Sequence, residues 1–261
     1  MSRVSRWITG MSNIMGQTIL LITLIMGIVP MALCADLGHD LSGVWIAIAA
    51  DPPSRLGPAM PSLAPAGKAM VKEFDDTYDK DAPEPGAYCV PMGIFAEMFS
   101  LAAYPIEIIQ QPHRITMLAE YDMQVRRIYM DGRGHPPDYP LTRMGHSIGH
   151  WDGDALVVDT ALLKEWHHSG WPHSDKTRIE ERIYLMRRAD AKVDLSSSFA
   201  SVIKPLDDVL LVDEITIDDP GTYTKTPKVT MYYQRISDDN ILEYDCAADL
   251  WEQALEAHKK K

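Results

Sequence analysis

The stretch Met144–Thr160, MGHSIGHWDGDALVVDT, predicts the fold because it combines strand-like alternation with a tight turn. Asp152-Gly153 is among the strongest short hairpin signals, since a type I′ turn needs positive φ at both central residues. The β-branched residues that follow favour a strand. With Asp152 and Gly153 as the loop, we expect paired strands over 144–151 and 154–160.

This predicted hairpin fixes which residues face each other. His146 is expected directly across from Asp159, with Cβ atoms about 4.5–5.5 Å apart. His150 shares their face, which is predicted to look into a cavity or into water. The packed face is predicted to hold Trp151, Leu156 and Val158.

Outward from the hairpin, the chain continues as a β-rich pattern of about ten strands with short connections. Strand character is found at 43–49, 106–111, 114–121, 124–131, 178–187, 194–203, 209–218, 229–236 and 241–246. Helical character is found at 65–75, 93–101 and 249–258. We predict a mainly β chain that forms a closed antiparallel β-barrel with a few short helices. A sandwich is the alternative, but a barrel leaves no long exposed edges.

The N-terminal segment has the features of a secretory signal. It contains two arginines and no acid, then an apolar run over 19–35 that ends in small residues. We predict a signal peptide at 1–35, a single barrel domain at 36–261, and a periplasmic or secreted protein. Because the apolar run is about 17 residues, near the lower limit for a membrane span, a retained anchor is the alternative.

Charge and cysteine content agree with export. The net charge of −12 disfavours binding to phosphate backbones, so we expect no nucleic-acid partner. Contact with a membrane is expected only if the N-terminal segment is retained. Once Cys34 leaves with the signal, Cys89 and Cys246 remain, and an even pair in an oxidising compartment predicts a disulfide. Two buried free thiols are the alternative.

His146 and Asp159 are the first catalytic candidates. A carboxylate that holds one ring nitrogen leaves the other as a base near neutral pH. The alternative is an exposed cross-strand ion pair worth well under about 1 kcal/mol. A register slip of one residue separates the two side chains.

A basic group precedes the hairpin, at Arg126, Arg127, Arg133 and His135. We predict that Arg126 or His135 stabilises developing negative charge and that Arg127 helps to bind substrate, because guanidinium groups form forked pairs with carboxylates. The alternative is a structural set of salt bridges with Asp131, Glu180, Glu181 or Glu243.

An aromatic loop follows the hairpin. Trp166, Trp171 and His173 are predicted to roof an apolar pocket, with Tyr223 as a further binding residue. The alternative is that they cap the barrel end as ordinary core.

We predict no metal site. On a strand, His146 and His150 lie about 13 Å apart, too far for a single ion. The loop histidines leave a metal-dependent hydrolase open as a second alternative function.

Five runs resemble recurring motifs of a large group of exported bacterial β-rich proteins with no assigned activity. They are AEYDMQVRRIYMDGRGHP (Ala119–Pro136), MGHSIGHWDGDALVVDT, PHSD (Pro172–Asp175), TIDDPGTYTKTP (Thr216–Pro227) and LEYDCAAD (Leu242–Asp249). The resemblance implies an exported, calycin-like (lipocalin-like) barrel, with Cys89 and Cys246 in its common pattern. It implies no reaction.

The sequence has no serine-nucleophile elbow, phosphate-binding loop, dinucleotide fingerprint or Cys-x-x-Cys. We therefore predict an exported, cofactor-independent lyase, isomerase or cyclase that holds a small, largely apolar organic substrate inside the barrel. His146 and Asp159 would supply acid-base catalysis. A small-molecule-binding protein without catalysis is the alternative.

Overall fold

A computed structural model describes most of the chain between Leu37 and Lys259. The described ranges are 37–54, 57–77, 90–99, 104–168, 170–196, 199–237, 239–244 and 248–259. The predicted signal segment and the predicted disulfide between Cys89 and Cys246 lie outside these ranges and stay predictions. Within them, no helix is both long enough and apolar enough to cross a membrane.

Nine strands and three α-helices make up the described regular structure. The strands are β1 (Gly43–Asp51), β2 (Ile106–Gln111), β3 (Arg114–Ala119), β4 (Gln124–Tyr129), β5 (His146–Asp152), β6 (Ala155–Ala161), β7 (Arg178–Arg187), β8 (Val209–Asp218) and β9 (Lys228–Ser237). The helices are α1 (Pro65–Thr77), α2 (Ile94–Phe99) and α3 (Ala248–Lys259).

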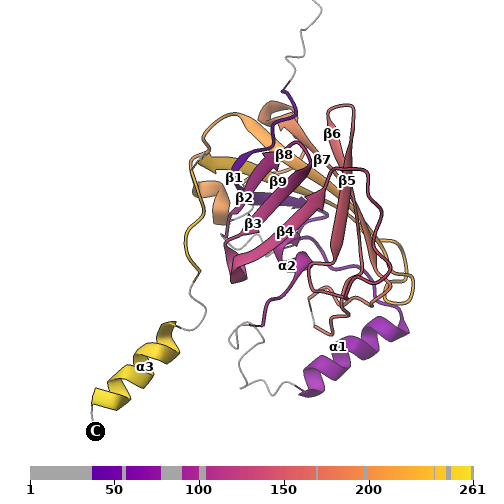
Figure 1. Ribbon diagram of the computed structural model, residues 1–261, viewed down its shortest axis with the longest axis vertical. Coiled ribbons are helices and arrows are strands. Elements are labelled where there is room, and N and C mark those ends of the chain that lie inside the picture. The colour runs from indigo at the N-terminus through magenta and orange to yellow at the C-terminus, as the bar shows by residue number, and fades with distance from the viewer. Residues whose placement is uncertain are drawn as a thin grey trace, which may run out of the picture. The chain divides into compact units, whose positions relative to one another are not determined.

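The strands form a closed barrel in the order of the chain, and β9 pairs with β1 to close it (Figure 1). Every neighbouring pair is antiparallel except β4 and β5, which run parallel. Parallel neighbours need a crossover connection of a dozen or more residues. Residues 130–145 form that connection, and it becomes one wall of the candidate site.

Period-two alternation decides which side chains enter the barrel. In β7, Ile179, Glu181 and Ile183 are buried, whereas the residues between them are exposed or half-buried. β4 alternates in the same way, with Arg126 buried and Arg127 exposed. The prediction of a mainly β closed barrel with a few short helices is confirmed, with one parallel pair in an otherwise antiparallel barrel.

Two predicted strands are not found. Over 194–203 the described residues form turns and a 3-10 helix, Phe199–Val202. Leu195, Ala200 and Ile203 pack on the outside of the barrel with a cluster that includes Ile46. These apolar residues do not follow the period of two that a strand requires, so they pack on the barrel from turns and a 3-10 helix. The described residues 241–244 also form no strand.

The central hairpin forms, but its turn differs from the predicted one. Gly153 and Asp154 are the loop residues, and Gly153 has φ = 58°. Asp152 therefore stays in β5, and the pairing shifts so that His146 lies across from Ala161 and Asp159 across from Ile148. The predicted direct His146–Asp159 pair is wrong.

The predicted packed face of the hairpin is correct. Leu156 and Val158 are fully buried, and Trp151 packs against the same cluster. Because the turn lies one residue later than predicted, each cross-strand partner moves by two residues, and a shift of two keeps every side chain on its face. His146, His150 and Asp159 consequently remain together on the outer face.

The interior contains one large apolar cluster. It holds residues from the barrel strands together with buried residues of α2, among them Ile94, Phe95, Met98 and Phe99. Tyr233 of β9 donates a 2.7 Å hydrogen bond to the carbonyl of Met98, which fixes α2 against the strands. The side chains of α2 thus fill space that an interior ligand would need.

Candidate functional site

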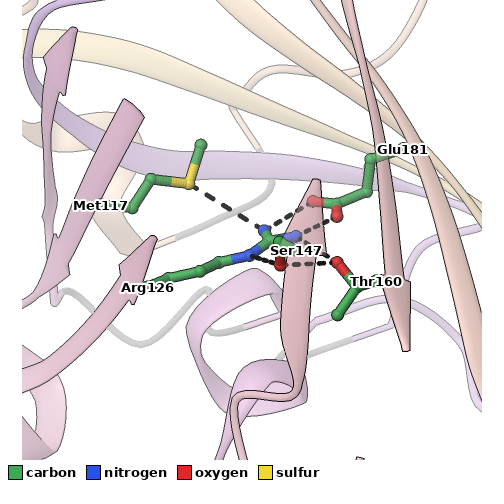
Figure 2. A network of polar contacts seen from close by, with 5 residues as sticks. All are labelled: Met117, Arg126, Ser147, Thr160 and Glu181. Carbon is green, nitrogen blue, oxygen red and sulfur yellow. Dashed lines mark hydrogen bonds and ion pairs between the residues drawn. The ribbon is translucent and has the colours of Figure 1, made fainter. Parts of the chain in front are cut away.

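The inner face of β4 to β7 carries a closed polar network (Figure 2). Arg126 of β4 is 2% exposed, and its guanidinium donates to both oxygens of Glu181 on β7. It also donates to Ser147 Oγ at 3.2 Å and to Thr160 Oγ1 at 2.9 Å. With Met117 sulfur at 4.0 Å as a weak acceptor, all five N–H groups have a partner.

This network has the geometry of a structural ion pair. Burial alone disfavours the charged guanidinium, but the attraction of Glu181 outweighs it and raises the pKa of Arg126. Every donor of Arg126 is occupied, so none is directed at a substrate. The salt-bridge alternative describes this residue, whereas its predicted catalytic role has no free donor to act through.

Two further carboxyl groups lie in the same interior. Burial raises the pKa of Glu97, in α2, to about 8. Burial, with Glu181 adding to it, also holds the pKa of Asp213 well above its usual range. One guanidinium cannot neutralise three buried carboxylates in a low-dielectric interior, so the protonated form of both Glu97 and Asp213 is favoured.

Beside these groups the interior holds a void of only about 10 Å³, lined by Glu97, Arg126 and Asp213 among others. A void of this size is at the lower limit for one water molecule. This void has no room for the predicted apolar substrate, and the larger hollows described below lie on the outer face.

The crossover connection brings a second histidine to the outer face of β5. His135 Nδ1 lies 2.9 Å from His146 Nδ1, and His135 Nε2 lies 3.3 Å from Asp159 Oδ2 on β6. The three side chains form a chain in which His135 connects the two predicted partners. The geometry therefore brings together three of the four predicted catalytic residues and separates Arg126 from them.

His146 is the buried end of this chain. It is 3% exposed, and its Nε2 is buried without a hydrogen-bond partner. The ring stacks on Tyr129 (centroids 5.1 Å apart, 20° between planes) and meets Tyr139 edge-on at 5.0 Å. Burial lowers the pKa of His146, and the nearby charges of His135 and Arg133 lower it further.

His146, Tyr129 and Tyr139 border a cleft of about 220 Å³ where β4 and β5 diverge. Only two residue pairs join these strands, Ile128 with Ser147 and Tyr129 with Ile148, so the first half of β4 has no partner on that side. The lining comprises Val125, Arg126, Arg127, Tyr129, Tyr139, Thr142, Met144, Gly145, His146 and Ser147. We call this the β4–β5 cleft.

Asp159 opens instead onto a wider outer groove of about 590 Å³ over β5 to β8. Arg178 Nη2 approaches its carboxylate at 3.5 Å, and the groove is also bordered by Arg133, Glu180 and Asp218. The series of contacts from His146 through His135 to Asp159 thus connects the narrow cleft with the wider, open groove.

The predicted aromatic binding residues lie elsewhere. Trp171, His173 and Tyr223 are buried around α2, where Trp171 packs on Phe95 and Phe99. Tyr223 donates to the carbonyl of residue 172 at 2.7 Å, and burial lowers the pKa of His173 to about 4. This is the barrel-end core that the alternative interpretation described.

Trp166 lies apart from them in a shallow surface hollow. Its ring stacks with His168 and lies beneath the guanidinium of Arg143. The other predicted binding residue, Arg127, does border the β4–β5 cleft.

Among the described residues, no three histidine, cysteine, aspartate or glutamate side chains are placed to hold a metal ion. The Nδ1 atoms of His135 and His146 lie within hydrogen-bond distance of each other, so the two histidines form a hydrogen-bonded pair.

The sequence-based prediction missed several site residues. Tyr129 and Tyr139 flank the DGRGHPP loop, but only the crossover brings their rings to His146. Glu97 and Asp213 also gave no local signal. Glu181 did give a signal in the sequence, because it interrupts the apolar face of a strand. A buried cation is the expected partner of such an acid.

The chain matches no model of a known protein family and no curated protein.

Proposed function

We propose that the protein is a cofactor-independent enzyme, a lyase or isomerase, that removes and returns a proton in the β4–β5 cleft with His146 as the base. The observation that supports this most directly is the buried, unpartnered Nε2 of His146 at the end of the chain through His135 to Asp159. The Nε2 atoms of other histidines, among them His135, His167 and His173, are also buried without a hydrogen-bond partner, so the distinguishing feature of His146 is its place between a cleft and the chain that leads to a carboxylate. A ring nitrogen in that position is a candidate proton acceptor.

The ring tautomers follow from the carboxylate at the far end. His135 Nε2 makes no hydrogen bond, but the negative Asp159 carboxylate lies 3.3 Å away and favours a proton on this nitrogen, which leaves His135 Nδ1 as an acceptor. His146 must then donate from Nδ1 and keep its lone pair on Nε2. A lowered pKa keeps that lone pair available at neutral pH.

Protonation of His146 Nε2 can be relieved along the same chain. The imidazolium passes its Nδ1 proton to His135, and the positive charge then lies 3.3 Å from the Asp159 carboxylate at the open groove. Such an arrangement suits a base that must take a proton from carbon and return it, which is the step shared by isomerases and eliminating lyases.

The proposed catalytic site lies on the outer side of the barrel wall, whereas the sequence suggested a site in the barrel interior. A substrate reaching Nε2 has to displace what covers it, and Tyr139 is the most exposed ring in contact with His146. Export to the periplasm or beyond, and kinship with exported calycin-like proteins, remain part of the proposal on sequence grounds.

The test is substrate discovery by mass spectrometry, followed by a single substitution. Compounds that copurify with the protein, and a panel of carbonyl compounds with acidic C–H bonds, are incubated in deuterium oxide and scored for product or deuterium uptake. For any compound turned over, His146→Ala should lower kcat/KM by about 100-fold or more. Added imidazole should restore part of the loss, because it can occupy the space of the missing ring.

His113→Ala is the matched control, since His113 is an exposed histidine in the turn between β2 and β3. It should leave kcat/KM unchanged. Full activity in His146→Ala would refute the proposal. Binding of a copurified compound with no product or deuterium uptake would instead leave a binding protein without catalysis.

A further inference from the structure

The β4–β5 cleft differs from the rest of this acidic protein in its charge. None of its ten lining residues is an aspartate or glutamate, although the chain carries a net charge of −12. The wider groove beside Asp159, by contrast, mixes arginines with three acids. A cleft without acids in such a chain is suited to a negatively charged guest.

Arg127 supplies the positive charge of this cleft. Its neighbour Arg126 also borders the cleft, but Glu181 neutralises it. Arg127 lies on the outer face of β4 and is exposed. Its side chain makes no hydrogen bond or ion pair with any described residue. Its forked donors are therefore free to bind a carboxylate in bidentate fashion.

An open flat surface lies on the same side. Tyr139 is exposed and meets His146 from the crossover connection. The ring of Tyr129, two residues after Arg127 on the outer face of β4, already contacts the His146 ring and the Arg133 guanidinium, which lies 4.2 Å from its centroid. Aromatic rings in a cleft favour a planar apolar body, while a single cation selects an anionic end.

We propose that the β4–β5 cleft binds a small planar carboxylate, with the carboxylate on Arg127 and the flat part against Tyr139. This places the remainder of the molecule beside the ring of His146. The inference names a substrate class for the proposed function and rests on it for its catalytic meaning, but its test reads binding alone.

The test is an NMR titration of the full-length protein with benzoate, and with benzyl alcohol as the uncharged analogue. Benzoate should bind saturably and shift the ring signals of His146, Tyr129 and Tyr139. Benzyl alcohol should bind about tenfold more weakly, the difference expected for one charge-assisted pair.

Three variants sharpen the titration. Arg127→Gln should weaken benzoate binding about tenfold, to the level of benzyl alcohol, whereas Arg127→Lys should retain part of the preference. Arg187→Gln removes the same charge at the exposed end of β7 and should leave benzoate binding unchanged. Near-UV circular dichroism checks that each variant keeps its packing.

The proposal is overturned if wild type binds both probes equally, if Arg127→Gln binds benzoate as wild type does, or if Arg187→Gln weakens it equally. The last outcome would mean that only the overall charge matters. Benzoate binding that depends on Arg127, in a protein that turns over no compound, would support this inference while the proposed enzymatic function fails.

Discussion

The inner and outer faces of β4 to β7 use adjacent residues for opposite purposes. Inside, Arg126, Ser147, Thr160 and Glu181 saturate one another in a closed network. Outside, their immediate neighbours in the chain are Arg127, His146, Asp159 and Glu180, which border open clefts. Each inner residue is nearly inaccessible, while the outer set includes an unpaired cation and an unpaired ring nitrogen.

This contrast indicates which face of the barrel can carry catalytic or binding residues. Polar groups in the interior lose water and must find protein partners, so they become structural. Polar groups on the outer face keep access to solvent and ligands, and can retain free donors and acceptors. The polar residues with catalytic potential are thus those that the barrel did not need for its own packing.

Arg126→Met should break the inner network with the largest effect. It leaves Glu181 buried without its cation, and removing one partner of a buried pair costs about 3–5 kcal/mol in the free energy of unfolding. Arg127→Met changes the neighbouring residue on the outer face and should cost less than about 0.5 kcal/mol. Urea denaturation of both variants measures the contrast, and equal losses would show that the two faces do not differ.

Glu97→Gln should change how the stability of the barrel depends on pH. The pKa of Glu97 is raised to about 8 in the folded protein, above its ordinary value of 4.5. Between these values the folded state holds a proton that the unfolded state releases. Stability is therefore fully present at low pH and falls as pH rises toward 8, by about 1.4 kcal/mol per pH unit for one proton.

The glutamine variant lacks this proton, so it should lose less stability between pH 4.5 and pH 8, and its gain relative to wild type should be complete near pH 8. Unfolding curves from pH 5 to 9 give the slope. Glu180→Gln, one residue from Glu181 on the outer face, is the exposed control and should follow wild type. A Glu97→Gln curve parallel to wild type would mean that the interior carboxyl is ionised throughout.

The smallest effect concerns the outer chain of histidines. An NMR titration should place the midpoint of His146 below 6.5, the ordinary value, because burial and the charges of His135 and Arg133 lower its pKa. Here the unfolded state binds the proton first, so this residue's contribution to stability is present above about pH 6.5 and is lost as pH falls below it.

Arg133→Gln removes one of these charges and should raise the midpoint toward the ordinary value. Arg187→Gln, distant from the site along β7, should leave it where it is. A midpoint above 6.5 in wild type would contradict the assignment of His146 as a neutral base.

Much of the barrel was predictable from local pattern. The strands of β2 to β9 were predicted within a few residues, because alternation and turn residues act over short stretches. Residues 194–203 were mistaken for a strand, since their apolar residues pack under a tertiary constraint that no local pattern contains. The hairpin register was missed because Asp152-Gly153 and Gly153-Asp154 are both acceptable loops, and only the packing of both strands selects between them.

The candidate site was predictable only in part. The sequence indicated His135, His146 and Asp159, but it predicted a direct contact between His146 and Asp159. In the structure His135 lies between them. The parallel pairing of β4 with β5 creates the crossover that returns His135 to His146, and a strand direction cannot be read from the pattern of one strand. Buried Glu97 and Asp213 escaped notice for a similar reason, because neither is close in sequence to Arg126.

The sequence by itself determined a β-barrel and the face on which each strand residue lies, because the period of two is a property of the extended backbone. Only the tertiary structure decided which residues meet across strands. It paired Arg126 with Glu181 in the interior, which removed that arginine from chemistry, and it placed His135 between His146 and Asp159 on the outside. Partners far apart in the chain depend on strand order, register and crossover, which are set by the packing of the whole barrel.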